Sequence, residues 1–330
     1  PKYVATLSDL ASNYLRCGQT VRAGTPLMET EVLNRLYMSR AQYFLTEQEM
    51  DQYVKGSVQQ TESFLSYLYN QKTTSSGLLQ TAWDDALFYK GMLQEKNRSL
   101  QFFIQNTSDS VQTISDHWKS CHRGLADLYA KSPAQRDSSS VAILQRQAAE
   151  AEKQLVRLSA GFAEARRQVS VTEVARTLEK NEAAIEFLQF HFYDSHNQKT
   201  DSTRYVAMVV LPNDTVPAWI PLFEEKQLQA LLDKTGDKAQ ATSTLYAART
   251  GKVLDQAPAY GTELYNLIWR PLDSLLRGVK TVYFAPSGLL HRVSFGALPI
   301  NSKKVLANKY ELHQLGSTRS LVVKTPQPVP

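Results

Sequence analysis

Two polar side chains, Ser287 and His291, stand four residues apart in the stretch YFAPSGLLHRVSFGALPI, directly after an apolar run. A serine nucleophile with a histidine base is the chemistry of acyl transfer in hydrolases. The nucleophile turn of such enzymes reads G-x-S-x-G, whereas this sequence reads A-P-S-G-L. A catalytic base also arrives from a distant segment as a rule. We therefore expect Ser287 and Gly288 to shape a turn, and His291 to be a hydrogen-bonded structural histidine.

The other nucleophilic and metal-binding residue types form no complete site. Cys121 and His122 are neighbours on a predicted helix, so their side chains point about 100° apart and cannot share a proton. His191 and His196 fall on opposite faces of a predicted strand, which argues against a two-histidine metal site. Cys17 carries no local signature of a reactive thiol. We expect no cofactor, no metal, no disulfide and a reducing, cytoplasmic compartment.

Charge and hydropathy patterns argue against two classes of partner. The net charge of +5 is mild for 330 residues, and no Lys/Arg-rich block predicts nucleic-acid binding. No apolar run approaches the roughly 20 residues of a membrane span. The chain begins Pro-Lys-Tyr and ends TPQPVP, and we expect it to be a piece of a longer protein.

The first half of the chain has apolar residues at helical spacing, which predicts a helical region over residues 1–132. Degenerate tetratricopeptide repeats remain an alternative for this region, although no convincing second copy of a 34-residue repeat is found. Acids in TAWDDALFYKG (Asp84, Asp85) and PLFEEKQ (Glu224, Glu225) are interpreted as helix N-terminal charges. An a/d stripe predicts one long linker helix over residues 141–169, with its apolar side packed on helices of the chain itself.

The second half, residues 170–330, changes character. SVTE at 170–173 fits a helix capping box, and the segments AAIEFLQFHFYD, TRYVAMVVLP and VPAWIPL predict an antiparallel meander. Two helical segments lead to the strand KTVYFAP, which we expect to be parallel to a neighbour. The predicted fold class is α plus α/β, with an N-terminal helical region, one long helix and a mixed-sheet α/β lobe.

Several motifs in order resemble the first half of a CHAT domain, a caspase- and separase-like family typically found behind tetratricopeptide repeats in bacteria. They are NEAAIEFLQF, DSTRYVAMVV, PAWIPLFEEKQL, ELYNLIWRPLDSLLRGVKTVYFAPSGLLHRVSFGALPI and KYELHQLGSTRSLV. The upstream DDALFYKGMLQEKNRSL also resembles the linker before CHAT domains of Bacteroides-type bacteria. The resemblance covers roughly residues 80 to 323, and it implies a caspase-like α/β lobe.

The resemblance also implies what this chain lacks. CHAT proteins are cysteine peptidases whose histidine, in a His-Gly turn, and cysteine, at a strand end, follow a Ser-Thr-Arg motif matched here by Ser317, Thr318 and Arg319. None of the six histidines precedes a glycine, and neither cysteine ends an apolar strand. Residues 170–330 would then be the pseudo-caspase half, and no residue is assigned a catalytic role. Tyr310, Leu312 and Leu315 would be exposed where the catalytic lobe packs.

The favoured function is a non-catalytic portion of a CHAT-type cysteine peptidase. Its lobe would support an absent catalytic lobe, and its helices would bind a protein partner or substrate. The alternative is a stand-alone interaction adaptor with no peptidase role. A serine hydrolase that uses Ser287 is the least favoured function. The chain alone is expected to be inactive.

Overall fold

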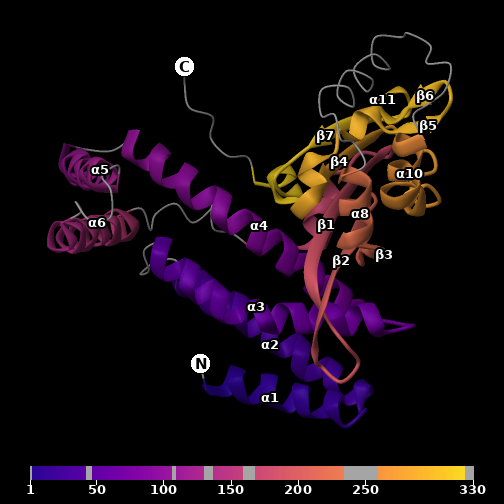
Figure 1. Cartoon of the computed structure of the whole chain (residues 1–330), viewed down its shortest axis with the longest axis horizontal. Coiled ribbons are helices and arrows are strands. Elements are labelled where there is room, and N and C mark those ends of the chain that lie inside the picture. Colours follow the sequence, from indigo (N-terminus) through magenta and orange to yellow (C-terminus); the bar gives the residue numbers. More distant parts are fainter. Residues whose placement is uncertain are drawn as a thin grey trace. The chain divides into compact units, whose positions relative to one another are not determined.

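The computed structural model describes residues 2–41, 47–105, 109–129, 137–158, 168–233 and 259–323 (Figure 1). As predicted, the first half is helical and the first described strand comes later, at Glu182. No helix in these ranges combines membrane-spanning length with an apolar composition. The helices of the first half are α1 (Lys2–Arg16), α2 (Thr20–Ala41), α3 (Glu47–Asn70), α4 (Ser76–Gln105), α5 (Asp109–Tyr129) and α6 (Ser138–Leu158).

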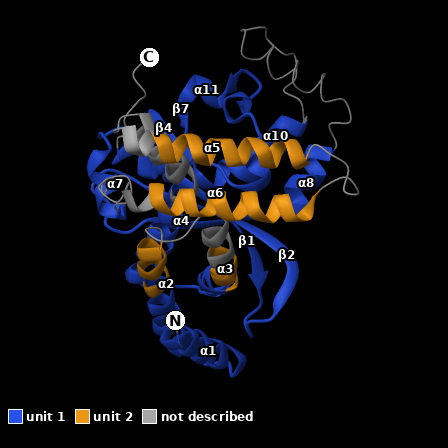
Figure 2. Cartoon of the chain, turned by 90° about the vertical axis from the view of Figure 1, so that its left-hand side faces the viewer, with its two compact units in different colours: residues 1–32, 60–91, 168–324 blue, residues 33–59, 92–167, 325–330 orange. Residues whose placement is uncertain are grey.

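The chain divides into two compact units, coloured separately in Figure 2. The first unit comprises residues 1–32, 60–91 and 168–324, and the second comprises residues 33–59, 92–167 and 325–330. Parts of α1 to α4 therefore belong to the same unit as all the strands. The domain boundaries expected from the sequence stay a prediction.

One mixed sheet of five strands forms the centre of the first unit, in the order β3-β2-β1-β4-β7. The first three strands in sequence form the predicted antiparallel meander, and β4 and β7 run parallel to β1 and β4 respectively. The predicted α plus α/β fold class is thus confirmed. The strands are β1 (Glu182–Tyr193), β2 (Lys199–Val210), β3 (Ala218–Glu224), β4 (Thr281–Ala285) and β7 (Glu311–Gln314).

Short helices and turns connect these strands. Ser170 precedes α7, and its backbone N–H donates to the Glu173 carboxylate at 2.9 Å, as the predicted capping box requires. Glu225 begins α8 as predicted, but Asp84 and Asp85 lie inside α4, which begins at Ser76. The helix starts earlier than the acids suggested because Leu78 extends the buried face of Ala82 and Leu87 toward its N-terminus. These elements are α7 (Val171–Thr177), α8 (Glu225–Asp233), α10 (Ala259–Ile268), η4 (Arg270–Leu272), η5 (Gly288–Arg292), η6 (Phe295–Ala297), β5 (Pro299–Asn301), β6 (Lys304–Val305), α11 (Leu306–Lys309) and η7 (Thr318–Leu321).

Each face of the sheet has its own hydrophobic cluster, because successive residues of a strand point to opposite sides. On one face, Leu188 of β1 belongs to the cluster that holds Phe64 of α3 and Trp83 of α4. On the other face, Phe187 belongs to the cluster that holds Trp269, beside α10. The sheet of the first unit therefore lies between α1–α4 on one side and α8 and α10 on the other.

The distal part of β1 is covered by side chains of α3. Strand β4 pairs only with the N-terminal part of β1, so the backbone of β1 beyond Glu186 has no strand neighbour on that side among the described residues. The Tyr193 N–H donates to Ser66 Oγ at 2.9 Å, and Asn70 Nδ2 donates to the Tyr193 carbonyl at 3.4 Å. These polar residues of α3 satisfy backbone groups that would otherwise be buried without partners.

The predicted long linker helix is described as far as Leu158, where α6 ends. Ala148, Ala151 and Leu155 of its stripe are buried, and α6 packs along α5 within the second unit. Residues 159–167 lie outside the described residues. The side chain that caps α6 is Asp137, which accepts hydrogen bonds from the serines that follow it, and these bonds lower the pKa of its carboxyl to about 2.

Candidate functional site

The turn after β4 holds Ser287 against the neighbouring strand and not against a base. Ser287 Oγ donates to the Phe187 carbonyl of β1 at 2.7 Å. His291 is exposed and has no hydrogen-bond partner among the described residues, so the expected hydrogen-bonded structural histidine is wrong. Because η5 turns the ring outward, Ser287 and His291 do not form a catalytic pair. The predicted turn role of Ser287 agrees with this geometry.

Replacing Ser287 with alanine is expected to leave any hydrolase activity of the chain unchanged and to cost about 1 kcal/mol of stability. The reason is that the hydroxyl makes one hydrogen bond, to a carbonyl that also accepts a bond from a lysine described below. Urea denaturation measures the stability, and ester and peptide substrates measure the activity. Complete loss of a hydrolase activity in the Ser287→Ala variant would contradict the prediction.

Gly288 is required in the same turn for two reasons. Its backbone is left-handed, and its neighbours leave no room for a Cβ atom. Its φ is +54°, and a Cβ atom at this position would lie 2.3 Å from the Tyr205 hydroxyl oxygen. That hydroxyl accepts the Leu289 N–H at 2.9 Å and donates to Glu225 at 2.8 Å. Burial and the bond to Glu225 raise the pKa of Tyr205, so the hydroxyl stays protonated and donates.

Glu186, in the middle of β1, is a fully buried carboxylate at the carboxyl ends of β4 and β7. One of its oxygens, Oε1, accepts hydrogen bonds from the Thr318 N–H at 2.6 Å, from Thr318 Oγ1 at 2.8 Å and from Ser317 Oγ at 3.2 Å. Ser317 and Thr318 are themselves buried, at the start of η7. Two residues of the Ser-Thr-Arg motif therefore bind this carboxylate.

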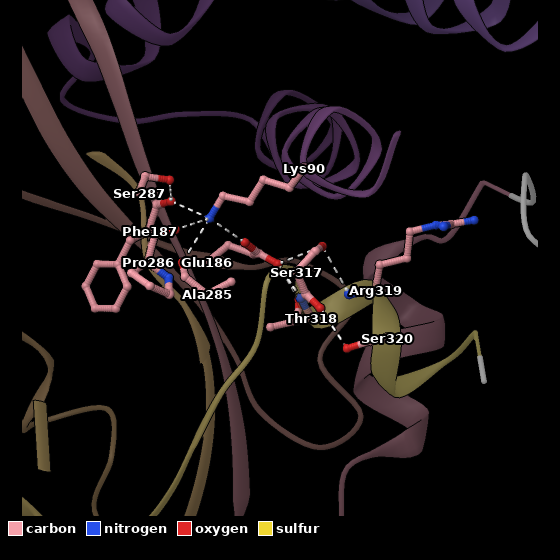
Figure 3. A network of polar contacts seen from close by, with 10 residues as sticks. All are labelled: Lys90, Glu186, Phe187, Ala285, Pro286, Ser287, Ser317, Thr318, Arg319 and Ser320. Atoms are coloured by element: carbon pink, nitrogen blue, oxygen red, sulfur yellow. Dashed lines mark hydrogen bonds and ion pairs between the residues drawn. The ribbon is translucent and has the colours of Figure 1, made fainter. Parts of the chain in front are cut away.

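Lys90 of α4 reaches the other oxygen of the same carboxylate (Figure 3). Its Nζ lies 2.8 Å from Glu186 Oε2, and it also donates to the carbonyls of Phe187 at 2.7 Å and Ala285 at 2.8 Å. The Pro286 carbonyl is a more distant fourth acceptor at 3.4 Å. We name Lys90, Glu186, Ser287, Ser317 and Thr318 the carboxyl-edge cluster. Its only ion pair among the described residues is strongly shielded from water, because the lysine side chain is 16% exposed and the glutamate 0%.

Arg319, the third residue of the motif, packs on α4 and does not bind Glu186. It is 5% exposed, and its Cδ lies 2.9 Å from the position that a Cβ atom would take on Gly91. Only a glycine at position 91 leaves room for this arginine without a shift. The Ser-Thr-Arg motif thus interacts with two consecutive residues of α4. Ser317 and Thr318 share the Glu186 carboxylate with Lys90, and Arg319 contacts Gly91 directly.

The comparison with protein families matches residues 258–329 to the family described as CHAT domain. The matched range includes β4, the turn with Ser287, strand β7 and the Ser-Thr-Arg motif. Residues 258–329 are thus similar to the CHAT domain. Comparison with curated proteins finds no match, and comparison with solved structures finds none either.

The five-stranded sheet ends at β7, whose outer side has no strand neighbour in the described part of the chain. Leu312 and Leu315, at this edge, are half-buried. Tyr310 is 3% exposed and packs 5.8 Å from the ring of Trp269, so its predicted exposure is wrong. The reason is its place before β7, where α11 ends and the ring turns into the cluster under α10.

Neither thiol is a member of the carboxyl-edge cluster. Cys17 is exposed at the end of α1, and Cys121 is buried in the second unit. Cys121 Sγ lies 3.8 Å from His117 Nε2, one helical turn earlier, and not beside the His122 weighed from the sequence. His191 contacts Glu62 of α3, with 2.6 Å between Nδ1 and Oε1. Within the described ranges, no three residues of the metal-binding types gather into a site.

Glu186 and Lys90 are the residues that sequence reasoning missed. Glu186 is the one ionisable residue in the buried run AAIEFLQF, and a charge in such a run requires a partner. That signal could have singled out the glutamate. Nothing local points to Lys90, which lies 96 positions away. The cluster can hold four segments together, but it has neither a thiol nor an imidazole to perform peptidase chemistry.

Proposed function

We propose that this chain is a non-catalytic portion of a CHAT-family cysteine peptidase. Its α/β lobe supports a catalytic lobe, and its helices serve protein interaction. The observation that carries the proposal is the carboxyl-edge cluster. The carboxyl ends of parallel strands are where α/β proteins place their functional side chains. Here a half-buried lysine and a buried glutamate, serine and threonine occupy that place and bind one another.

The edge of the sheet supports the scaffolding role. Strand β7 is parallel to β4 and has a free outer edge in the described part of the chain, where unpaired backbone groups favour addition of another strand. Leu312 and Leu315 are half-buried there, so part of their apolar surface is still available. A catalytic lobe that continues the sheet would cover both features.

The helices of the first unit support the interaction role. Tyr3 and Leu10 on α1 and Val21 on α2 are exposed to 56%, 40% and 89%. Single exposed apolar residues are ordinary, but three on two consecutive helices offer anchors for an amphipathic partner. Protein is therefore the class of partner that these helices favour.

The purified 330-residue chain is expected to cleave no peptide. Its activity should equal the buffer rate across fluorogenic substrates that vary the residue before the cleaved bond, because the carboxyl-edge cluster contains neither a thiol nor an imidazole. Cys17→Ser and Cys121→Ser variants are the controls. Cleavage that either substitution abolishes would contradict the non-catalytic role.

Sequencing the gene beyond the codon for Pro330 separates this role from the adaptor. A reading frame that continues into a His-Gly turn and a strand-end cysteine supports the peptidase portion. A stop codon at that point supports the stand-alone adaptor.

A further inference from the structure

A small cavity lies at the tip of the β1–β2 hairpin, entirely within the first unit. Its volume is about 120 Å³, and its walls come from three places: the turn between α1 and α2, the C-terminal end of α3 and the hairpin tip. Pockets for drug-sized ligands begin at about 300 Å³, so this cavity has room for a small molecule or for the end of one side chain.

The side chain of Asn197 fixes the three walls to one another. Its Oδ1 accepts a hydrogen bond from Ser63 Oγ of α3 at 2.6 Å, and its Nδ2 donates to Ser12 Oγ of α1 at 3.0 Å. Its φ of 57° is the left-handed conformation that asparagine tolerates in tight turns. The walls are therefore held in place by the chain itself, and a ligand does not have to assemble them.

Asp194, at the end of β1, provides the charge of the cavity. It is the one acidic residue among the described residues that line the cavity, and none of them is basic. Its Oδ1 accepts the N–H groups of His196 and Gln198, both at 2.9 Å, which stabilises the hairpin turn. Its Oδ2 has no hydrogen-bond partner in the described part of the chain. A lining with one negative charge and one free carboxylate oxygen favours a cation.

Tyr67 and Asn70 of α3 add two neutral acceptors to this lining. Tyr67 is only 7% exposed, and its hydroxyl has no hydrogen-bond partner among the described residues. The Asn70 amide donates through Nδ2 to the Tyr193 carbonyl at 3.4 Å, so its Oδ1 remains as an acceptor. A buried hydroxyl without a protein partner requires one from water or a ligand. With Asp194, the lining offers three acceptors, and a primary ammonium group has three N–H donors.

The apolar part of the lining separates an organic cation from a metal ion. Leu15 is buried and lines the cavity together with the ring of Tyr67, and such a wall packs well against the methylene groups of an alkylamine. Calcium prefers six to eight oxygen ligands that include several carboxylates, and only one carboxylate is present among the described lining residues. A ligand with an ammonium head and a short methylene stem uses both parts of the lining.

We propose that this cavity binds a primary alkylammonium group. The ammonium is held by Asp194, Tyr67 and Asn70, and the methylene stem lies against Leu15. The same group occurs on free small amines and on a lysine side chain of a protein partner. The inference goes beyond the proposed function, since no member of the carboxyl-edge cluster lines the cavity.

Titration of the 330-residue chain with n-butylammonium, followed by two-dimensional ¹H–¹⁵N NMR, tests the site. The amides of residues 67–71 and 194–198 should shift and saturate. Asp194→Asn should weaken binding at least about tenfold, because it removes the charge while its Oδ1 can still accept the two N–H groups of the hairpin turn. Asp201→Asn is the matched control, because this exposed carboxylate pairs with Lys226 on β2–α8, and its affinity should equal that of the wild type.

Tyr67→Phe provides a second variant that keeps the ring and removes only the hydroxyl. It should weaken binding by about threefold or more, and it decides the test if Asp194→Asn disturbs the spectrum beyond the hairpin. 1-Butanol has the same stem without the charge and should leave the amides unshifted. Equal binding of 1-butanol, tighter binding of calcium chloride at the same amides, or wild-type affinity in both variants would overturn the proposal.

A blocked Gly-Lys-Gly peptide distinguishes the two sources of the ammonium group. If the cavity takes a lysine of a protein partner, the peptide should shift the same amides, and acetylation of its Nζ should abolish the shifts. If the cavity takes only free amines, n-butylammonium binds and the peptide does not. Peptide cleavage by the chain would refute the proposed function and leave this titration unchanged.

Discussion

Lys90→Met is expected to lower the free energy of unfolding of the first unit by about 3–5 kcal/mol. Methionine has nearly the same length and fills the same space, so the loss is electrostatic and not a cavity. The substitution leaves the fully buried Glu186 charge without its cation and the carbonyls of Phe187 and Ala285 without their donor. Breaking one side of a buried ion pair costs more than the pair contributes.

Urea denaturation followed by tryptophan fluorescence measures this loss. Three of the four tryptophans belong to the first unit, and a Trp118→Phe background removes the one in the second. The midpoint should fall by roughly 1–2 M urea. Lys309→Met is the matched control, because its ion pair with Asp273 is 3.2 Å long but partly exposed, and it should cost about 0–1 kcal/mol.

The double variant Lys90→Met/Glu186→Gln distinguishes an unpaired charge from lost packing. Glutamine keeps acceptors for Ser317 and Thr318 but carries no charge, so much of the stability should return. Equal losses for Lys90→Met and Lys309→Met would refute the assignment of a strong buried pair.

The sheet was predictable because its sequence signals are local. Each strand of the meander has β-branched and aromatic residues bounded by polar turns, and the turn residues Asn197 and Asn213 adopt the left-handed conformation that such turns need. The parallel direction of β4 was predictable because helices precede it in the chain, and a strand reached through a helical crossover is usually parallel to its neighbour. The capping box at Ser170 was predictable because its two members, Ser170 and Glu173, stand only three residues apart in the sequence.

The carboxyl-edge cluster was not predictable because its members come from four distant segments. A sequence pattern shows that Glu186 needs a partner, but it does not show that α4 supplies one. The burial of Tyr310 and the outward position of His291 were not predictable for a similar reason. Tyr310 directly follows α11 and His291 lies inside η5, and the local pattern does not show which side of such a short element packs on the rest of the fold.

Gly288→Ala is expected to destabilise the first unit by about 2–4 kcal/mol. A non-glycine residue at a φ of +54° costs about 1 kcal/mol by itself. The larger part comes from the new methyl group, which would lie 2.3 Å from the Tyr205 hydroxyl oxygen and 2.5 Å from Gln189 Oε1. Neither can move freely, since both are hydrogen-bonded to Glu225.

Gly278→Ala provides the matched control for backbone strain. Gly278 has a φ of +81°, but a Cβ atom there would meet nothing within 4 Å, so only the cost of the left-handed backbone remains. In the same urea experiment, Gly288→Ala should lose at least about twice the free energy that Gly278→Ala loses. Adding Tyr205→Phe to Gly288→Ala removes the oxygen that the methyl group would strike and should recover part of the difference. If both glycine variants lose the same amount, the turn after β4 is fixed by its backbone conformation alone, and the contact with Tyr205 does not hold it against the sheet.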